Sequence, residues 1–237
     1  MIPYERRERI LEHLSRVKSA TVRELAAELY ISEASVRRDI AALEHRGLLI
    51  RHYGGVMLCE NRNGVVPVSL RDAEHSAAKE EVARRAAALI RDGDTVMMDA
   101  SSTVRRMLHY LNDRRDVTVI TNNLRLFDEC QNPSIRLYAT GGMYSAENHA
   151  LVGAGAEQSL RGVSADAVFF SSQGISEDGE ITDASEAETA LRRVMLARSR
   201  RQYFLCDSSK VGVRRLFTLC HKDDVTALIG NEPFPWE

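Results

Sequence analysis

The spacing of apolar residues changes character part way along the chain. In roughly the first fifty residues, apolar side chains recur every three or four positions, as in helices that bury one face. Farther on, short apolar runs typical of buried strands alternate with helical stretches. The pattern therefore predicts a small helical domain followed by a larger domain of alternating strands and helices.

Polar residues at the boundaries of the apolar pattern predict three helices in the first part. Thr21 and Glu24 have the spacing of a capping box, and Ser32 is a favourable N-cap. Gly47 readily takes the left-handed conformation that ends a helix. The expected helices are Tyr4–Val17, Thr21–Leu29 and Ser32–Gly47, with a break at Lys18–Ala20.

Two helices joined by a short turn form a helix-turn-helix motif, whose second helix lies in the major groove of DNA. After this motif, the β-type runs Leu48–Ile50 and Val56–Leu58 flank a turn over Arg51–Gly55. The alternative for Gly54-Gly55 is a plain hairpin turn. With the preceding helices in place, the order of elements predicts a winged helix-turn-helix domain over residues 1–58, with the hairpin as its wing.

The last of the three helices carries the candidate DNA contacts. Val36, Ile40 and Leu43 share an apolar face, so at 3.6 residues per turn the opposite face carries small residues and Arg38. Small residues let a backbone approach a groove, and arginine reaches guanine edges or phosphates. A solvated helix of an ordinary helical hairpin is the alternative. The predicted DNA contacts are Ser35, Arg37, Arg38, Arg51, His52 and Tyr53.

The larger part of the chain is expected to be an α/β domain over residues 71–237. Residues 59–70, which contain asparagine, glycine and proline, are the expected linker. Strand-like runs that alternate with helices imply a mostly parallel sheet covered on both faces. The predicted strands are Thr95–Met98, Val117–Ile120, Ile135–Tyr138, Ala167–Phe170 and Gln202–Leu205.

Small polar residues and glycines repeatedly follow these predicted strands. Ligands of open α/β sheets bind at the carboxyl ends of strands. Residues 101–103 would open a helix, whose free amides and positive dipole end favour phosphate, and paired glycines would let amides approach closely. Two lysines would offset the charge, and two aspartates would accept bonds from sugar hydroxyls. The predicted effector contacts are Lys79, Asp99, Ser101, Ser102, Thr103, Thr121, Asn122, Gly141, Gly142, Asp207 and Lys210.

Each of these residues also has an ordinary structural explanation. A serine or threonine after a strand is more often a helix cap than a ligand contact, and a lone glycine pair is usually a turn. Lys79 could be a solvated helix residue, and Asp207 could cap the turn at Ser209-Lys210. Five such strand endings on one edge of a sheet nevertheless favour a ligand site.

Composition and charge narrow the class of protein. The chain has 237 residues and a net charge of −2, which argues against a non-specific polycation. Residues 1–58 carry ten basic and eight acidic side chains, a mild positive excess. No apolar run is long enough to span a membrane and no signal-like start is present, so we expect a cytoplasmic protein. The four cysteines are widely separated, so we expect reduced thiols, no metal site and no cofactor.

Several segments of the first part together resemble the DeoR family of bacterial sugar-responsive repressors. Ser35-Val-Arg-Arg-Asp-Ile40 is similar to the family's recognition-helix signature. Arg51, Gly54 and Gly55 match its wing, which here has Tyr53 where histidine is usual and Val56 where alanine is usual. The supporting segments are Glu5–Leu11, Val22–Ala26, Ser32–Ile40 and Arg51–Gly55.

The larger part resembles the effector domain of the same family, which is similar to the folds of ribose-5-phosphate isomerase and glucosamine-6-phosphate deaminase. Asp207-Ser-Ser-Lys210 keeps a family motif, whereas Ser101 and Ser102 replace a glycine and a threonine of another. Arg192 stands where lysine is usual in a loosely matched helix. Further matches are Lys79, Asp99, Thr103, Thr121-Asn122 and Gly141-Gly142.

The resemblance implies a repressor of carbohydrate-metabolism genes that leaves its operator when a phosphorylated sugar or related metabolite binds. One helix-turn-helix contacts only a few base pairs, so we expect a homodimer or homotetramer joined through the larger domain. The alternative is a sugar-phosphate isomerase or deaminase with a DNA-binding module. Asp178, Asp183 and Glu186 are the candidate bases for such an enzyme. No catalytic histidine motif is present, and we predict a protein that is not an enzyme.

Overall fold

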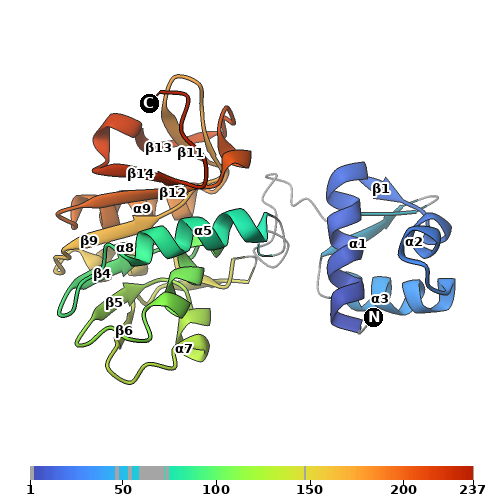
Figure 1. Cartoon of the computed structure of the whole chain (residues 1–237), viewed down its shortest axis with the longest axis horizontal. Helices are drawn as coiled ribbons and strands as arrows, with labels where there is room; N and C mark the ends of the chain where they lie inside the picture. Colours follow the sequence, from blue (N-terminus) through green and yellow to red (C-terminus); the bar gives the residue numbers. More distant parts are fainter. Residues whose placement is uncertain are drawn as a thin grey trace. The chain divides into compact units, whose positions relative to one another are not determined.

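The computed structural model describes residues 3–45, 48–52, 55–58, 72, 75–146 and 148–236. The chain divides into two compact units, Met1–Glu74 and His75–Glu237 (Figure 1). Each unit has a hydrophobic core of its own. The predicted helix stop at Gly47, the wing residue Tyr53 and the predicted linker 59–70 lie outside the described residues.

The described part of the N-terminal unit consists of three helices and a small antiparallel sheet. The predicted capping box is present, because Thr21 Oγ1 accepts the Glu24 amide at 3.1 Å and the Glu24 carboxylate accepts the Thr21 amide at 2.7 Å. The elements are α1 (Pro3–Val17), β1 (Ser19–Ala20), α2 (Val22–Leu29), α3 (Glu33–His45), β2 (Leu49–His52) and β3 (Gly55–Leu58).

The apolar faces of the three helices form one core, against which the hairpin of β2 and β3 packs. Buried side chains of this core include Ile10, Leu14, Leu25, Ile40 and Leu43. The strand order β1-β3-β2 places the hairpin strand β3 in the centre. The predicted winged helix-turn-helix is therefore confirmed. The predicted break before α2 is present, and two of its residues form the strand β1, which pairs with β3 and was not predicted.

Asp39 fastens α3 to α1. Its side chain is 1% exposed, and it accepts hydrogen bonds from Arg6 Nε at 2.7 Å and Arg7 Nε at 3.1 Å. Charge-assisted bonds from two guanidinium groups hold a carboxylate in one place. They therefore fix which face of α3 is turned toward solvent.

The C-terminal unit is built around a six-stranded parallel sheet with the order β14-β12-β9-β4-β5-β6. The sequence pattern identified five of these strands but missed β14, a four-residue strand at the edge of the sheet. The strands are β4 (Thr95–Met98), β5 (Thr118–Thr121), β6 (Arg136–Ala139), β9 (Ala167–Phe170), β12 (Gln202–Cys206) and β14 (Ala227–Gly230). The predicted parallel α/β sheet is confirmed.

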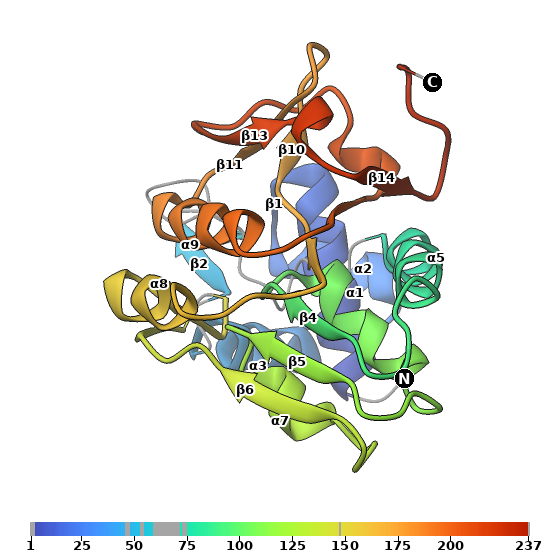
Figure 2. The ribbon, with the colours of Figure 1, turned by 90° about the vertical axis from the view of Figure 1, so that its left-hand side faces the viewer.

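Helices cover both faces of this sheet (Figure 2). Alternate residues of a strand point to opposite faces. Val96 and Met98 pack in the core beneath α5, whereas Met97 between them packs in the core beneath α8 and α9. The helices are α5 (Ser76–Ala87), α6 (Ser102–Arg105), the 3-10 helix η1 (Arg106–Tyr110), α7 (Arg125–Glu129), α8 (Ala154–Leu160) and α9 (Glu186–Ala197).

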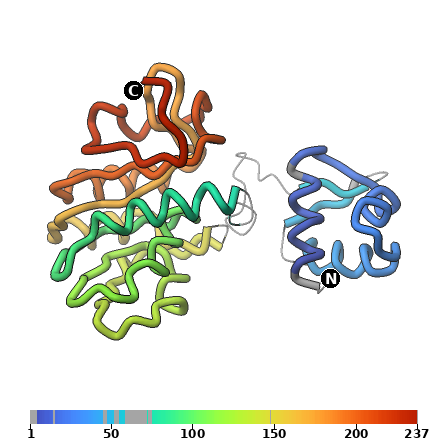
Figure 3. The backbone as a smooth tube through the Cα atoms, in the orientation of Figure 1, coloured from blue at the N-terminus to red at the C-terminus, as the bar shows by residue number. Residues whose placement is uncertain are grey.

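Two small antiparallel sheets adjoin the main sheet, and the sequence pattern predicted neither. The backbone tube in Figure 3 shows the path of the C-terminal segment. This segment is bonded to the turn between β10 and β11, because Trp236 Nε1 donates to the Glu177 carbonyl at 2.8 Å. The added elements are β7 (Met143–Ser145), β8 (Ala150–Val152), β10 (Gly174–Ile175), β11 (Glu180–Asp183), β13 (Phe217–His221), η2 (Ser208–Lys210) and η3 (Lys222–Asp224). In the part of the chain that the structure describes, every helix is too short or too polar to traverse a lipid bilayer.

Candidate functional site

The outer face of α3 is exposed and begins at a capped helix start. Ser32 Oγ lies 3.3 Å from the Ser35 amide that it accepts and 3.0 Å from Ser35 Oγ. The predicted contact Ser35 is therefore half-buried at the first turn, with its hydroxyl partly engaged by the cap. Arg38 points outward on the same face, and its Nε donates to the Ala34 carbonyl at 3.4 Å.

The arginines predicted to meet phosphate line a common groove beside α3. This groove has a volume of about 390 Å³ and includes Arg37 and Arg51, together with Arg23, which the sequence analysis did not single out. Arg37 is paired with Glu33 at 2.8 Å, and Arg51 with Glu44 at 2.9 Å. The backbone of His52 belongs to β2, but its side chain lies outside the described part, as does Tyr53.

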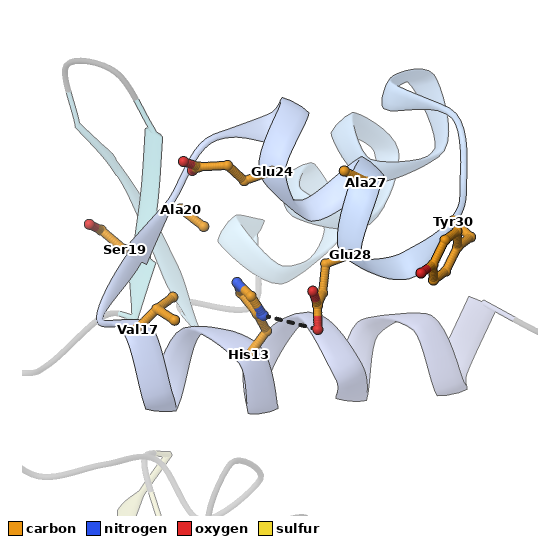
Figure 4. Close-up of a pocket in the computed structure, with 8 residues that line it drawn as sticks. All are labelled: His13, Val17, Ser19, Ala20, Glu24, Ala27, Glu28 and Tyr30. Carbon is orange, nitrogen blue, oxygen red and sulfur yellow. Dashed lines mark ion pairs between the residues drawn. The ribbon is translucent and has the colours of Figure 1, made fainter.

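A second hollow of the N-terminal unit, of about 500 Å³, lies between α1 and α2. None of the predicted DNA contacts lines it. His13 and Glu28 face each other across it, with 3.8 Å between Nδ1 and Oε1 (Figure 4). This hollow is therefore separate from the groove that holds Arg37 and Arg51.

In the C-terminal unit, the strand order brings the predicted effector residues to one edge of the sheet. Strands β12, β9, β4, β5 and β6 are neighbours and parallel, so their carboxyl ends lie side by side. The chain leaves β4 toward β5 but leaves β9 toward β12 on the other side. Such a switch point between neighbouring strands opens the crevice where α/β sheets bind ligands.

Asp99 occupies this switch point but is engaged by the protein itself. Its side chain is 1% exposed. One carboxylate oxygen accepts the Ser101 amide at 3.0 Å, and the other accepts the Ser171 amide at 3.3 Å and Arg192 Nε at 2.7 Å. The expected role of Asp99 as an acceptor for sugar hydroxyls is therefore not favoured. It positions the loops that follow β4 and β9.

Arg192 is the centre of a buried ionic network that the sequence analysis did not identify. Its guanidinium is 4% exposed and also contacts Asp183 and Glu188, each at 2.9 Å. Burial alone would lower the pKa of Arg192, but the carboxylates of Asp183, Asp99 and Glu188 raise it above its usual value. The i,i+4 spacing of Glu188 and Arg192 was visible in the sequence, whereas the distant partner Asp99 was not.

Three buried oxygens along this edge have no hydrogen-bond partner among the described residues. They are Thr103 Oγ1, Asn122 Oδ1 and Asp207 Oδ2. Buried polar atoms are usually paired, so each unpaired one needs an explanation such as water or a ligand. All three residues belong to the predicted effector set and follow the ends of β4, β5 and β12.

Cations gather around Asp207. Lys210 Nζ donates to Ser171 Oγ at 2.7 Å and lies 3.7 Å from Asp207 Oδ2. Burial alone would raise the pKa of Asp207, but Lys210, the Ser209 hydroxyl, Lys79 and His75 together lower it below its usual value. Lys79 is 3% exposed on α5, so it is not the solvated helix residue that was its alternative.

Three of the remaining predicted residues have structural roles that are visible without a ligand. Ser101 caps α6, since its Oγ accepts the Val104 amide at 3.3 Å, and Thr121 Oγ1 accepts the Asn123 amide at 3.0 Å. Gly142 has a φ of +105°, and a Cβ there would lie 2.7 Å from the Val152 carbonyl oxygen. Ser102 is buried at the start of α6, and Gly141 is exposed beside Gly142.

The three carboxylates considered for an enzymatic base lie in different settings. Asp183 is tied to Arg192. The Ser176 hydroxyl and Arg214 lower the pKa of Asp178, which makes it a weaker base. Glu186 lies in the first turn of α9. In the described ranges, no group of three or more histidine, cysteine or acidic side chains could hold a metal ion.

Solved structures of similar fold share the α/β unit. The structure of eIF2B delta from Chaetomium thermophilum has a TM-score of 0.50 at 16% identity and covers 70% of this chain and 62% of that one. Ribose 5-phosphate isomerase A from Methanocaldococcus jannaschii has a TM-score of 0.43 at 16% identity. The match covers 58% of this chain and 55% of that structure, little more than half of its length. At such identities the likeness concerns the fold alone.

Sequence relatives cover nearly the whole chain. An HTH-type transcriptional repressor GlcR from Bacillus subtilis is 32% identical over 97% of this chain and 88% of its own length. A lactose phosphotransferase system repressor from Staphylococcus epidermidis is 30% identical over 97% of this chain and 92% of its own length. Both relatives are named as regulators.

Two family models match consecutive parts of the chain. Residues 6–62 match the DeoR-like helix-turn-helix domain, and residues 74–232 match the DeoR C terminal sensor domain. The first match covers the exposed α3 and its wing, and the second covers the strand-end edge with its unpaired oxygens. The chain thus belongs to the DeoR family, as a DNA-binding transcriptional regulator whose C-terminal domain senses a small-molecule effector.

Proposed function

We propose that this regulator represses genes of carbohydrate metabolism and leaves its operator when a phosphorylated sugar binds to the sensor domain. The name of the lactose phosphotransferase system repressor supports the class of genes. On the DNA side, Ser35 and Arg38 contact the groove, Arg37 and Arg51 contact phosphates, and His52 and Tyr53 are further DNA contacts. The bond network of Asp39, which fixes the exposed face of α3, supports this assignment.

The observation that carries the effector proposal is the set of three buried oxygens without a hydrogen-bond partner among the described residues, one of which lies near Lys210. Asn122 Oδ1 and Asp207 Oδ2 are acceptors, so they call for hydroxyl donors, which a sugar supplies. The Thr103 hydroxyl can donate, and Lys210 adds positive charge, so both suit a phosphate. A sugar phosphate combines the two kinds of group in one molecule.

The strand order also limits which of the proposed residues one phosphate can contact. Neighbouring strands lie about 4.8 Å apart, so β12 and β6 are separated by roughly 19 Å. One phosphate therefore does not reach both Lys210, after β12, and Gly141-Gly142, after β6. We place the phosphate beside Ser102, Thr103 and the lysines, and the sugar toward Thr121 and Asn122. The glycine pair then borders the far end of the site.

Sugar phosphates should bind the full chain at least tenfold more tightly than the corresponding free sugars, because charge-assisted bonds are lost without the phosphate. Calorimetric titration of a panel of hexose and pentose phosphates and their free sugars measures this difference. Equal affinities within each pair would overturn the phosphate assignment.

Thr103→Val is the sharpest variant for this test, because it removes an unpaired hydroxyl at nearly constant volume. It should weaken binding of the phosphate without lowering the melting temperature. Thr95→Val is the matched control, since Thr95 is the first residue of β4, whereas Thr103 lies in α6, after the other end of that strand. Unchanged binding in the Thr103 variant would remove this residue from the site.

We also propose that the chain assembles as a homodimer or homotetramer, since a pair of reading helices is needed for symmetric half-sites. Light scattering at micromolar concentration should give a mass of two or four chains. A strict monomer, both free and bound to DNA, would contradict this assembly.

A further inference from the structure

The two arginines assigned to DNA phosphates are already ion-paired within their own domain. Arg37 Nη2 lies 2.8 Å from Glu33 Oε2, and Arg51 Nε lies 2.9 Å from Glu44 Oε2. All four side chains are exposed, from 40% for Glu44 to 64% for Arg37. These pairs are therefore on the surface and do not brace the core.

Each glutamate lies against an arginine of the groove. Glu33, Arg37 and Arg51 line this groove, together with Arg23, and Glu44 is bonded to Arg51. The N–H that is bonded to a carboxylate is not available to a phosphate, and the negative charge of the carboxylate repels the phosphate. Glu33 and Glu44 therefore oppose the binding of the DNA backbone to Arg37 and Arg51.

Arg38 is arranged differently. Its Nε donates to the Ala34 carbonyl at 3.4 Å, and the described residues provide no carboxylate partner for it. The arginine assigned to base edges is thus open, whereas the two assigned to phosphates are occupied. The glutamates therefore compete with the phosphate contacts, which do not depend on the DNA sequence.

We propose that Glu33 and Glu44 compete with DNA phosphates for Arg37 and Arg51, and so lower the affinity of this regulator for every duplex, whatever its sequence. The inference rests on the DNA interface of the proposed function. Its consequence is a moderate overall affinity, from which a bound effector can release the protein. Since exposed ion pairs are weak, DNA still displaces both glutamates.

The test uses the full chain with the variants Glu33→Gln, Glu44→Gln and both together. The probes are a duplex that the wild-type chain selects from a random-sequence pool and a scrambled duplex of equal length. Each single change should raise affinity for both probes by roughly two- to fivefold at moderate salt, and the double change by more. The ratio of the two affinities should stay constant, and the dependence on salt should steepen.

Glu28→Gln is the matched control, because it removes the same charge from the same domain at the hollow lined by His13. It should change affinity little. An equal gain in this control, or no gain in the Glu33 and Glu44 variants, would overturn the competition. A gain on the selected duplex alone would also overturn it, because Arg37 and Arg51 would then read bases.

The same two duplexes distinguish a failure of the proposed competition from a failure of the proposed DNA interface. Arg37→Ala and Arg51→Ala should each weaken binding to both duplexes. If they do and the glutamate variants change nothing, the interface stands and the competition fails. If the arginine variants also bind both duplexes as the wild type does, the interface itself is wrong. The melting temperatures of all variants identify any loss of folding. Glu44→Gln tests the competition at a position outside the first turn of α3.

Discussion

Replacing Arg192 with methionine should lower the free energy of unfolding of the C-terminal domain by about 3–5 kcal/mol. Methionine retains an apolar stem of similar length but no charge. Asp99, Asp183 and Glu188 would then be buried carboxylates without their common counter-charge. The same change should also abolish effector binding, because Asp99 would no longer be held between the loops after β4 and β9.

Chemical denaturation followed by circular dichroism measures this loss. Arg84→Met is the control, since Arg84 is 58% exposed and its pair with Glu81 is a surface contact, so little change is expected. Arg192→Lys keeps the charge with fewer donors and should lie between the two. An Arg192→Met protein as stable as the Arg84 control would show that the network does not hold the domain together.

Arg38→Ala should weaken binding to a selected duplex by about 1–3 kcal/mol, which is roughly 5- to 150-fold, and relax the preference for one base pair. The reason is that a bidentate contact to a base edge carries both affinity and specificity. Arg37→Ala should instead weaken selected and scrambled duplexes alike. Fluorescence anisotropy with both duplexes distinguishes the two patterns. Unchanged affinity of the Arg38 variant at moderate salt would refute the assignment of the recognition face.

Local signals made the N-terminal domain predictable from the sequence. The bonds of the capping box join Thr21 and Glu24, three positions apart, and the apolar stripe of α3 repeats within a few turns. Strand β1 was not predictable in this way, because two residues become a strand only through pairing with β3. The short strand β14 and the hairpin of β7 and β8 likewise depend on partners elsewhere in the chain.

The sequence also indicated where the effector site lies but not which side chains remain open there. Thr103 and Thr121 each follow a strand and look equivalent in the sequence. In the structure, Thr121 Oγ1 accepts the Asn123 amide, whereas Thr103 Oγ1 has no partner in the described part of the chain. Asp99 and Asp207 were given the same role, yet Arg192 engages Asp99 from 93 positions away. Such distinctions arise from long-range packing, which the chain order does not reveal.

In the proposed function, effector binding and DNA binding oppose each other within one protein. Coupling between two ligands is reciprocal, so a sugar phosphate that weakens DNA binding must itself bind less tightly to the DNA complex. The direct test is calorimetric titration of the sugar phosphate that binds best into the full chain, with and without the selected duplex. We expect the duplex to weaken effector binding by roughly 5- to 150-fold, and the effector to weaken DNA binding by the same factor. Equal effector affinities in the presence and absence of the duplex would contradict the account.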